Sequence, residues 1–139
     1  MNPTIDEILS VFFADRLAST SGVRSQRVVR VEHVLRTCLE ESGDRVLTTG
    51  ELEILNLERA FEPRGALVRT MHADVLVFAL PLFVSQPYLM ADRLDRLEQL
   101  RAANGLTHMV VSSGLIDARD YACPILDIEC AVRVARATV

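Results

Sequence analysis

The chain has 139 residues, of which half are apolar and about a quarter are charged, so length and composition predict one globular domain over residues 1–139. The formal net charge of −4 argues against general nucleic-acid binding, because DNA and RNA are bound by basic faces. The three cysteines form no Cys-x-x-Cys pair, which excludes a disulfide framework and a zinc site and favours a reducing, cytoplasmic location. Neither a signal peptide nor an apolar run of membrane-spanning length is visible, so we expect no membrane partner.

The first third of the chain is predicted to hold a strand, a loop and a helix. Residues 8–13 form a short apolar run with β-branched and aromatic side chains, which favours a strand, although they can also belong to a helix that starts near Thr4. Residues 14–26 are rich in Ser, Thr and Gly and predict a loop. Apolar residues then recur with helical spacing up to Ser42, which predicts a helix capped by Ser25 and stopped by Gly43.

The middle of the chain contains its most apolar stretch, residues 75–80, between Asp74 and Pro81. A short run that is apolar on both faces is typical of a strand buried on both sides of a sheet. Before it, residues 50–57 begin with alternating acidic and apolar side chains and predict another strand. Residues 63–71 predict a short helix between the two strands, with Leu67, Val68 and Met71 facing inward.

The last third is predicted to hold a helix over residues 88–103, a strand over 107–112 and a final helix that begins near Asp120. Asn104 and Gly105 would end the first of these helices. Its predicted inner face is Met90, Leu94, Leu97 and Leu100, and its solvated, ion-paired face is Asp92, Arg93, Asp95, Arg96, Glu98 and Arg101. The inner face of the final helix would be Ile125, Ile128, Ala131, Val132 and Ala135.

The cysteines and histidines are expected to be structural. Cys123 and Cys130 lie seven residues apart on one face of the final helix, and buried thiols are the expected arrangement there. His33, His72 and His108 lie on different predicted elements, so no shared metal site is expected.

Strands and helices therefore alternate along the chain, which predicts an α/β fold with an open parallel sheet of about four strands flanked by helices in three layers. An all-α fold is the alternative, in which residues 5–41 form two helices that are vaguely similar to the helical arm-binding domain of tyrosine recombinases. The acidic charge and the continuous apolar run at 75–80 favour the sheet.

Residues 73–84, Ala-Asp-Val-Leu-Val-Phe-Ala-Leu-Pro-Leu-Phe-Val, followed by Asp-Arg-Leu-Asp-Arg-Leu at 92–97, resemble the flavodoxin-like fold and most closely its NAD(P)H-dependent FMN reductases. Residues 110–115, Val-Val-Ser-Ser-Gly-Leu, are similar to the next strand and glycine loop of that family. The resemblance implies an FMN-binding oxidoreductase that transfers hydride from NADH or NADPH to a small acceptor such as a quinone or a flavin.

The resemblance also implies the residues that would bind the cofactor. The FMN phosphate would lie at the start of the first helix, with Arg24 and Arg27 as charge partners. Its cradle would be Thr20, Ser21, Gly22 and Ser25. The isoalloxazine ring would lie between Pro81, Leu82, Phe83 and Val84 on one side and Ser113 and Gly114 on the other. No catalytic side chain is assigned, since the flavin itself carries the hydride chemistry.

Two differences from that family support a second hypothesis, a non-enzymatic flavodoxin-like binding or assembly module that has lost the cofactor. The phosphate loop has Ala14-Asp15-Arg16 where the family has Gly-Ser-x-Arg, and the family's fifth strand has no counterpart. The sheet would then end along residues 108–111 with an open edge, so a homodimer or a partner chain is expected to pair there.

Overall fold

The computed structural model describes residues 2–138, and its regular elements are helices. Within residues 2–138 there is no strand, and one isolated antiparallel bridge joins Thr4 to His72. The predicted α/β fold, an open parallel sheet with flavodoxin-like layers, is therefore wrong, and the all-α alternative gives the correct class. The elements are α1 (Ile5–Ala18), α2 (Val23–Ser42), the 3-10 helix η1 (Gly43–Val46), α3 (Thr49–Phe61), α4 (Ala66–Thr70), α5 (Ala73–Phe83), α6 (Arg93–Ser112) and α7 (Ala122–Ala137).

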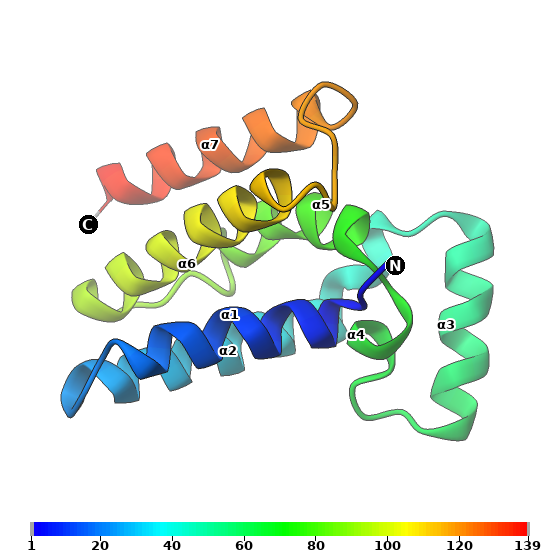
Figure 1. Ribbon diagram of the computed structural model, residues 1–139, viewed down its shortest axis with the longest axis horizontal. Helices are drawn as coiled ribbons and strands as arrows, with labels where there is room; N and C mark the ends of the chain where they lie inside the picture. Colours follow the sequence, from blue (N-terminus) through cyan, green and yellow to red (C-terminus); the bar gives the residue numbers. More distant parts are fainter. Residues whose placement is uncertain (1, 139) are drawn as a thin grey trace.

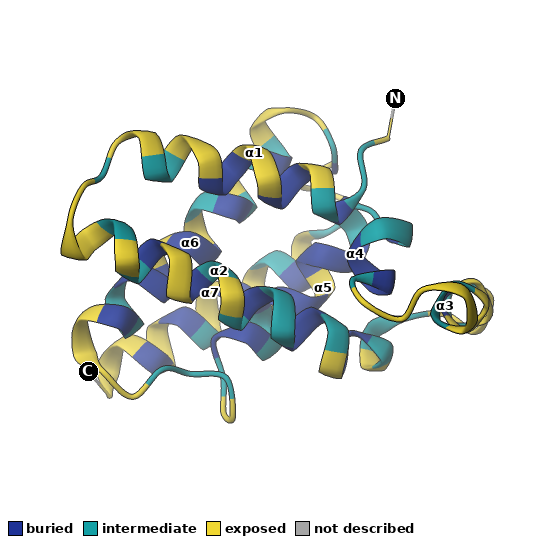
Figure 2. Ribbon diagram, turned by 90° about the horizontal axis from the view of Figure 1, so that it is seen from below, coloured by how far each residue is buried: buried dark blue, intermediate teal, exposed yellow. Residues whose placement is uncertain are grey.

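Helices α1, α2, α5, α6 and α7 form a bundle, and α3 stands apart from it at one end (Figure 1). Helix α2 packs against α5 and α6, and α7 packs against the same two helices from the other side. Helix α1 lies against α2 and α4. The buried residues point into this bundle, whereas α3 is seen end-on at the edge of the molecule (Figure 2). None of the helices in residues 2–138 is long and apolar enough to cross a bilayer.

The apolar stretch at 75–80 belongs to helix α5 rather than to a strand. Val75, Leu76, Val77 and Leu80 are at most 2% exposed, because α2, α6 and α7 all contact this helix. A short run of apolar residues has the same pattern in a buried helix and in a buried strand. The prediction failed because α5 is surrounded by other helices, which removes the polar face that normally reveals a helix.

The two other N-terminal strand predictions are also wrong, and in both cases a helix start was overlooked. Residues 8–13 lie in α1, which begins with a capping box formed by Thr4 and Glu7. Residues 50–57 lie in α3, which begins with the equivalent box formed by Thr48 and Glu51. The Thr-x-x-Glu spacing was visible in the sequence and marks a helix N-terminus.

The predicted strand at 107–112 is the second half of α6, which continues through Asn104 and Gly105. Gly105 has a packing role, because a Cβ atom there would lie 2.9 Å from Cζ of Phe12. The glycine therefore leaves room for the Phe12 ring instead of ending the helix.

The buried face of α6 differs from the predicted one. Leu94 is 45% exposed, whereas Asp95 and Glu98, which were expected on a solvated face, are buried. Arg30 donates to Asp95 with an Nη2–Oδ1 distance of 2.7 Å, and Glu98 pairs with Arg16 from α1. The charged residues of α6 therefore join helices to one another. The inner face continues through Gln99, Ala102, Ala103, Leu106 and Val110.

Other predicted features agree with the structure. Helix α2 ends before Gly43, as expected, although its N-cap is Gly22 and not Ser25. In α4 and the residue after it, Leu67, Val68 and Met71 are buried, and in α7 the residues Ile128, Val132 and Ala135 are buried.

The two cysteines of α7 were wrongly expected to be buried: Cys123 and Cys130 lie on its exposed side, and Cys38 of α2 is the buried thiol.

Candidate protein-binding surface

Helix α3 carries three large apolar side chains that are exposed to solvent: Ile54 is 53%, Leu57 75% and Phe61 86% exposed. Their spacing of three and four residues places them on one side of the helix. Leu55, the buried residue of α3, points to the other side, where the helix packs against α4. We call Ile54, Leu57 and Phe61 the outer stripe of α3.

The outer stripe has the spacing of a helix that packs against another helix. Gly50 extends it by one turn, so that residues 50, 54, 57 and 61 follow one another at intervals of four, three and four. A helix that carries apolar residues on two sides is normally covered by other protein segments on both of these sides. An exposed apolar patch of this kind is typical of a protein-interaction surface.

Acidic residues border the outer stripe. Glu53 lies on one flank, and Glu51 and Glu58 lie on the other. Arg59, the only basic residue of α3, faces the bundle, where it pairs with Asp44. The outer stripe is therefore an apolar surface with a negative rim.

Ion pairs fix α3 to the end of α2. Arg59 donates two hydrogen bonds to Asp44 of η1, of 2.8 and 2.9 Å, and one of 3.0 Å to the backbone carbonyl of Glu40. The Arg59 hydrogen bonds are the main reason that the pKa of the Asp44 carboxyl is below its ordinary value. This bidentate geometry sets the direction of the helix as well as its position.

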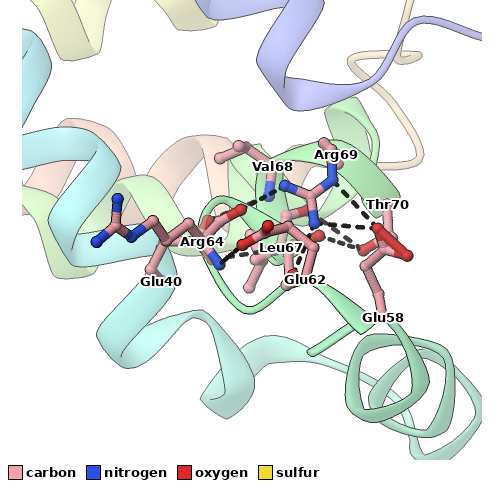
Figure 3. A network of polar contacts seen from close by, with 9 residues as sticks. Glu40, Glu58, Glu62, Arg64, Leu67, Val68, Arg69 and Thr70 are labelled. Carbon is pink, nitrogen blue, oxygen red and sulfur yellow. Dashed lines mark hydrogen bonds and ion pairs between the residues drawn. The ribbon is translucent and has the colours of Figure 1, made fainter. Parts of the chain in front are cut away.

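A second group of polar contacts holds the segment that follows α3 (Figure 3). Arg69 donates to the Glu58 carboxylate at 3.0 Å and to the backbone carbonyl of Glu62 at 2.8 Å. Glu40 of α2 accepts from the backbone N–H groups of Leu67 and Val68, at 3.0 and 3.2 Å. Glu40 thereby caps the start of α4, whose free N–H groups would otherwise lack partners. These contacts hold α3, and with it the outer stripe, in a fixed position relative to α2 and α4.

A cavity of about 450 Å³ lies beside these contacts, between α2 and residues 63–65. Two of its charged residues are already engaged, since Arg36 pairs with Asp6 and Glu32 while Glu40 caps α4. Within residues 2–138 there is also no cluster of three or more side chains suited to hold a metal ion. The outer stripe is therefore the feature of this end of the molecule that calls for a partner.

The residues predicted to bind FMN lie in three separate places. Thr20, Ser21 and Gly22 form the turn between α1 and α2, and Ser25 lies in the first turn of α2, where its Oγ is 3.1 Å from Oγ1 of Thr20. Pro81, Leu82 and Phe83 form the last turn of α5, and Val84 is its C-cap. Ser113 and Gly114 follow α6.

The structure does not bring these three groups together. Arg24 lies 3.7 Å from Glu98, which places the start of α2 beside the first half of α6. Ser113 follows Glu98 by 15 residues, or about 22 Å along the helix, so it lies at the other end of α6. Phe83 and Val84 are at most 2% exposed, so their side chains lie in the core.

The predicted ring loop is part of the core instead. The amide of Gln99 donates to the backbone carbonyls of Phe83 and Tyr88, both at 2.9 Å, and accepts from the N–H of Met90 at 2.9 Å. Gln99 is fully buried, and these bonds satisfy it while they fix the loop between α5 and α6.

The open sheet edge expected at residues 108–111 does not exist, because those residues are helical in α6. FMN binding and hydride transfer stay predictions, and the flavodoxin-like sheet on which they depended is absent from residues 2–138. No protein-family model matches the chain, and neither the curated proteins nor the solved structures include a match to it.

Proposed function

We propose that the protein is a helical binding module that docks on a partner protein through the outer stripe of α3. The observation that carries this proposal is the exposure of Leu57 and Phe61, at 75% and 86%, on a helix whose position is fixed by ion pairs. A preformed helix with apolar anchors at residues i, i+3 and i+7 is a recurring recognition element between proteins. Its fixed support lowers the entropy that binding would otherwise cost.

The partner that fits the outer stripe is an amphipathic helix with basic residues beside its apolar face. Glu51, Glu53 and Glu58 flank the stripe, and none of the flanking positions carries an arginine. Arginine or lysine on the partner would pair with this rim, as charges at the corresponding positions do in coiled coils.

Charge argues against a second copy of the chain as the partner. If two α3 helices packed through their outer stripes, glutamates of one would face glutamates of the other, and Arg69, which pairs with Glu58, would leave Glu51 and Glu53 uncompensated. Like charges across such a seam disfavour the pairing.

The proposal is tested with two synthetic helical peptides that share one apolar stripe, one flanked by arginines and the other by glutamates. We expect the basic peptide to shift backbone amide resonances of residues 50–62 in a ¹⁵N-labelled sample, and the acidic peptide to bind at least about tenfold more weakly. Leu57→Asp should abolish the shifts. Leu126→Asp, at a 57% exposed leucine of α7, is the matched control and should leave them unchanged.

Three results would overturn the proposal. The first is the absence of α3 shifts at millimolar basic peptide, and the second is equal binding of the two peptides. The third is a dimer in light scattering that Leu57→Asp converts to a monomer, because a second copy would then occupy the stripe.

A further inference from the structure

A small cavity between α2 and α6 is lined mainly by arginine. It has a volume of about 230 Å³ and is lined by Arg24, Arg27, Leu94, Leu97, Glu98 and Arg101. Its lining residues belong to the first turns of α2 and the first half of α6. These two helices begin at the end of the bundle opposite to α3 (Figure 1). The cavity is therefore independent of the outer stripe.

The positive charge of this cavity is not neutralised by the protein. Glu98, its one acidic residue, is 2% exposed and already pairs with Arg16 from α1 and, at 3.7 Å, with Arg24. Arg27 and Arg101 form no ion pair with any acidic residue in the described part of the chain, residues 2–138. The guanidinium groups of Arg24, Arg27 and Arg101 thus surround the cavity, which has one carboxylate, that of Glu98. This carboxylate also pairs with Arg16, which does not line the cavity.

The start of α2 adds to this positive potential. Its N-cap, Gly22, provides no side-chain acceptor, and the first turn of the helix contains no acidic residue. The N-terminal N–H groups and the helix dipole therefore favour an anion on the same side as Arg24 and Arg27. On a chain with a net charge of −4, three clustered arginines, of which Arg27 and Arg101 form no ion pair within residues 2–138, are a local excess of positive charge.

We propose that this cavity binds the phosphate group of a small phosphate monoester. Guanidinium groups offer planar pairs of N–H donors that match phosphate oxygens, and three of them can surround one dianion. Leu94 and Leu97 provide an apolar wall on the α6 side, which suits an organic substituent on the phosphate. A phosphate monoester therefore gains contacts that free phosphate does not make.

The test is calorimetric titration of the protein with inorganic phosphate and with phenyl phosphate, at constant ionic strength. We expect both to bind, phenyl phosphate more tightly, and Arg27→Gln or Arg101→Gln to weaken each by about tenfold, the effect of losing one charged hydrogen-bond donor. Neither arginine pairs with an acid, so these variants should fold. Arg133→Gln, at an exposed arginine of α7, is the matched control and should bind like the wild type.

The wild-type protein provides a second measurement that does not depend on any variant. Phenyl phosphate should shift the side-chain Nε–Hε resonances of Arg24, Arg27 and Arg101 and leave the amides of α3 unchanged. Tighter binding of free phosphate than of phenyl phosphate would show that an inorganic ion is the ligand and would overturn the monoester assignment. Absence of binding by both anions, or equal weakening by Arg133→Gln, would overturn the site itself.

Discussion

Helices α3 and α5 both carry several large apolar side chains, but their surroundings differ. Both were predicted as strands, and both are helices. Seven residues of α5 are buried, whereas Leu55 is the one buried residue of α3. Except for Phe78, which is 45% exposed, the large apolar side chains of α5 are largely covered by α2, α6 and α7, but those on the outer side of α3 are in water. The presence of large apolar side chains therefore does not by itself reveal whether they are buried or exposed.

The two helices are also held in place by different forces. Burial of apolar surface stabilises α5, because each buried leucine or valine is removed from water on all sides. Helix α3 depends largely on polar contacts made by Arg59 and Arg69. We therefore expect substitutions in the two helices to differ in size and in how far their effect spreads.

The largest effect is expected for Leu76→Ala in α5. Leu76 is fully buried, so its truncation leaves a cavity in the core and should lower the free energy of unfolding by about 3 kcal/mol. Urea denaturation followed by circular dichroism measures this change. Val29→Ala, at a 53% exposed position of α2, is the control and should change stability by less than about 0.5 kcal/mol. If both variants lost the same stability, α5 would not be the centre of the core.

A smaller and more local effect is expected for Arg59→Ala. The variant loses the paired hydrogen bonds to Asp44 and the bond to the Glu40 carbonyl, in a partly exposed site where about 1 kcal/mol is expected. Hydrogen exchange should accelerate in α3 and remain unchanged in α5. Arg133→Ala is the control. Uniform acceleration in all helices would contradict the separation of α3 from the bundle.

The same contact predicts a weaker, pH-dependent effect. Because Arg59 lowers the pKa of Asp44 in the folded protein below its ordinary 3.8, the contribution of Asp44 to stability is present above about pH 4 and lost as the pH falls through the folded value. The difference in unfolding free energy between wild type and Asp44→Asn should therefore shrink between about pH 5 and pH 3. A constant difference over this range would show that Arg59 does not set the pKa.

The smallest effect on stability is expected at the outer stripe. Phe61 is 86% exposed, so Phe61→Ser should change the free energy of unfolding by less than about 0.5 kcal/mol. Phe83→Ser, at a fully buried phenylalanine of α5, is the contrasting variant and should destabilise the protein strongly. A large loss of stability in Phe61→Ser at any protein concentration would mean that the outer stripe is already covered.

The sequence predicted some amphipathic helices well and the uniformly apolar helix badly. Helices α2 and α7 were located because polar residues alternate with their buried faces at helical spacing, but α3 was taken as a strand although it is amphipathic. In α5 the contrast between a polar and an apolar face is missing. For α1 and α3, the capping boxes at Thr4 and Thr48 indicated a helix start. Once segments of four helices, α1, α3, α5 and α6, were taken as strands, a resemblance to a parallel-sheet family followed from the error.

The candidate surface could be found from the sequence only in part. The spacing of Ile54, Leu57 and Phe61 is visible as soon as residues 49–61 are taken as a helix. Which of its two apolar sides faces the protein depends on α4 and on Arg59, and these are tertiary contacts that no local pattern encodes. Similarly, Arg24 and Arg27 were noted as charge partners of a phosphate, but Arg101 joins them only through the packing of α2 on α6.

Gly43 links the bundle to α3 and controls more than the end of α2. A side chain there would collide with Leu67 of α4, which is itself fully buried. Any larger residue would therefore force the Leu67 side chain to shift within the core. The hydrogen atom of Gly43 in place of a side chain thus allows the end of α2 to lie directly against α4, the helix on which α3 packs.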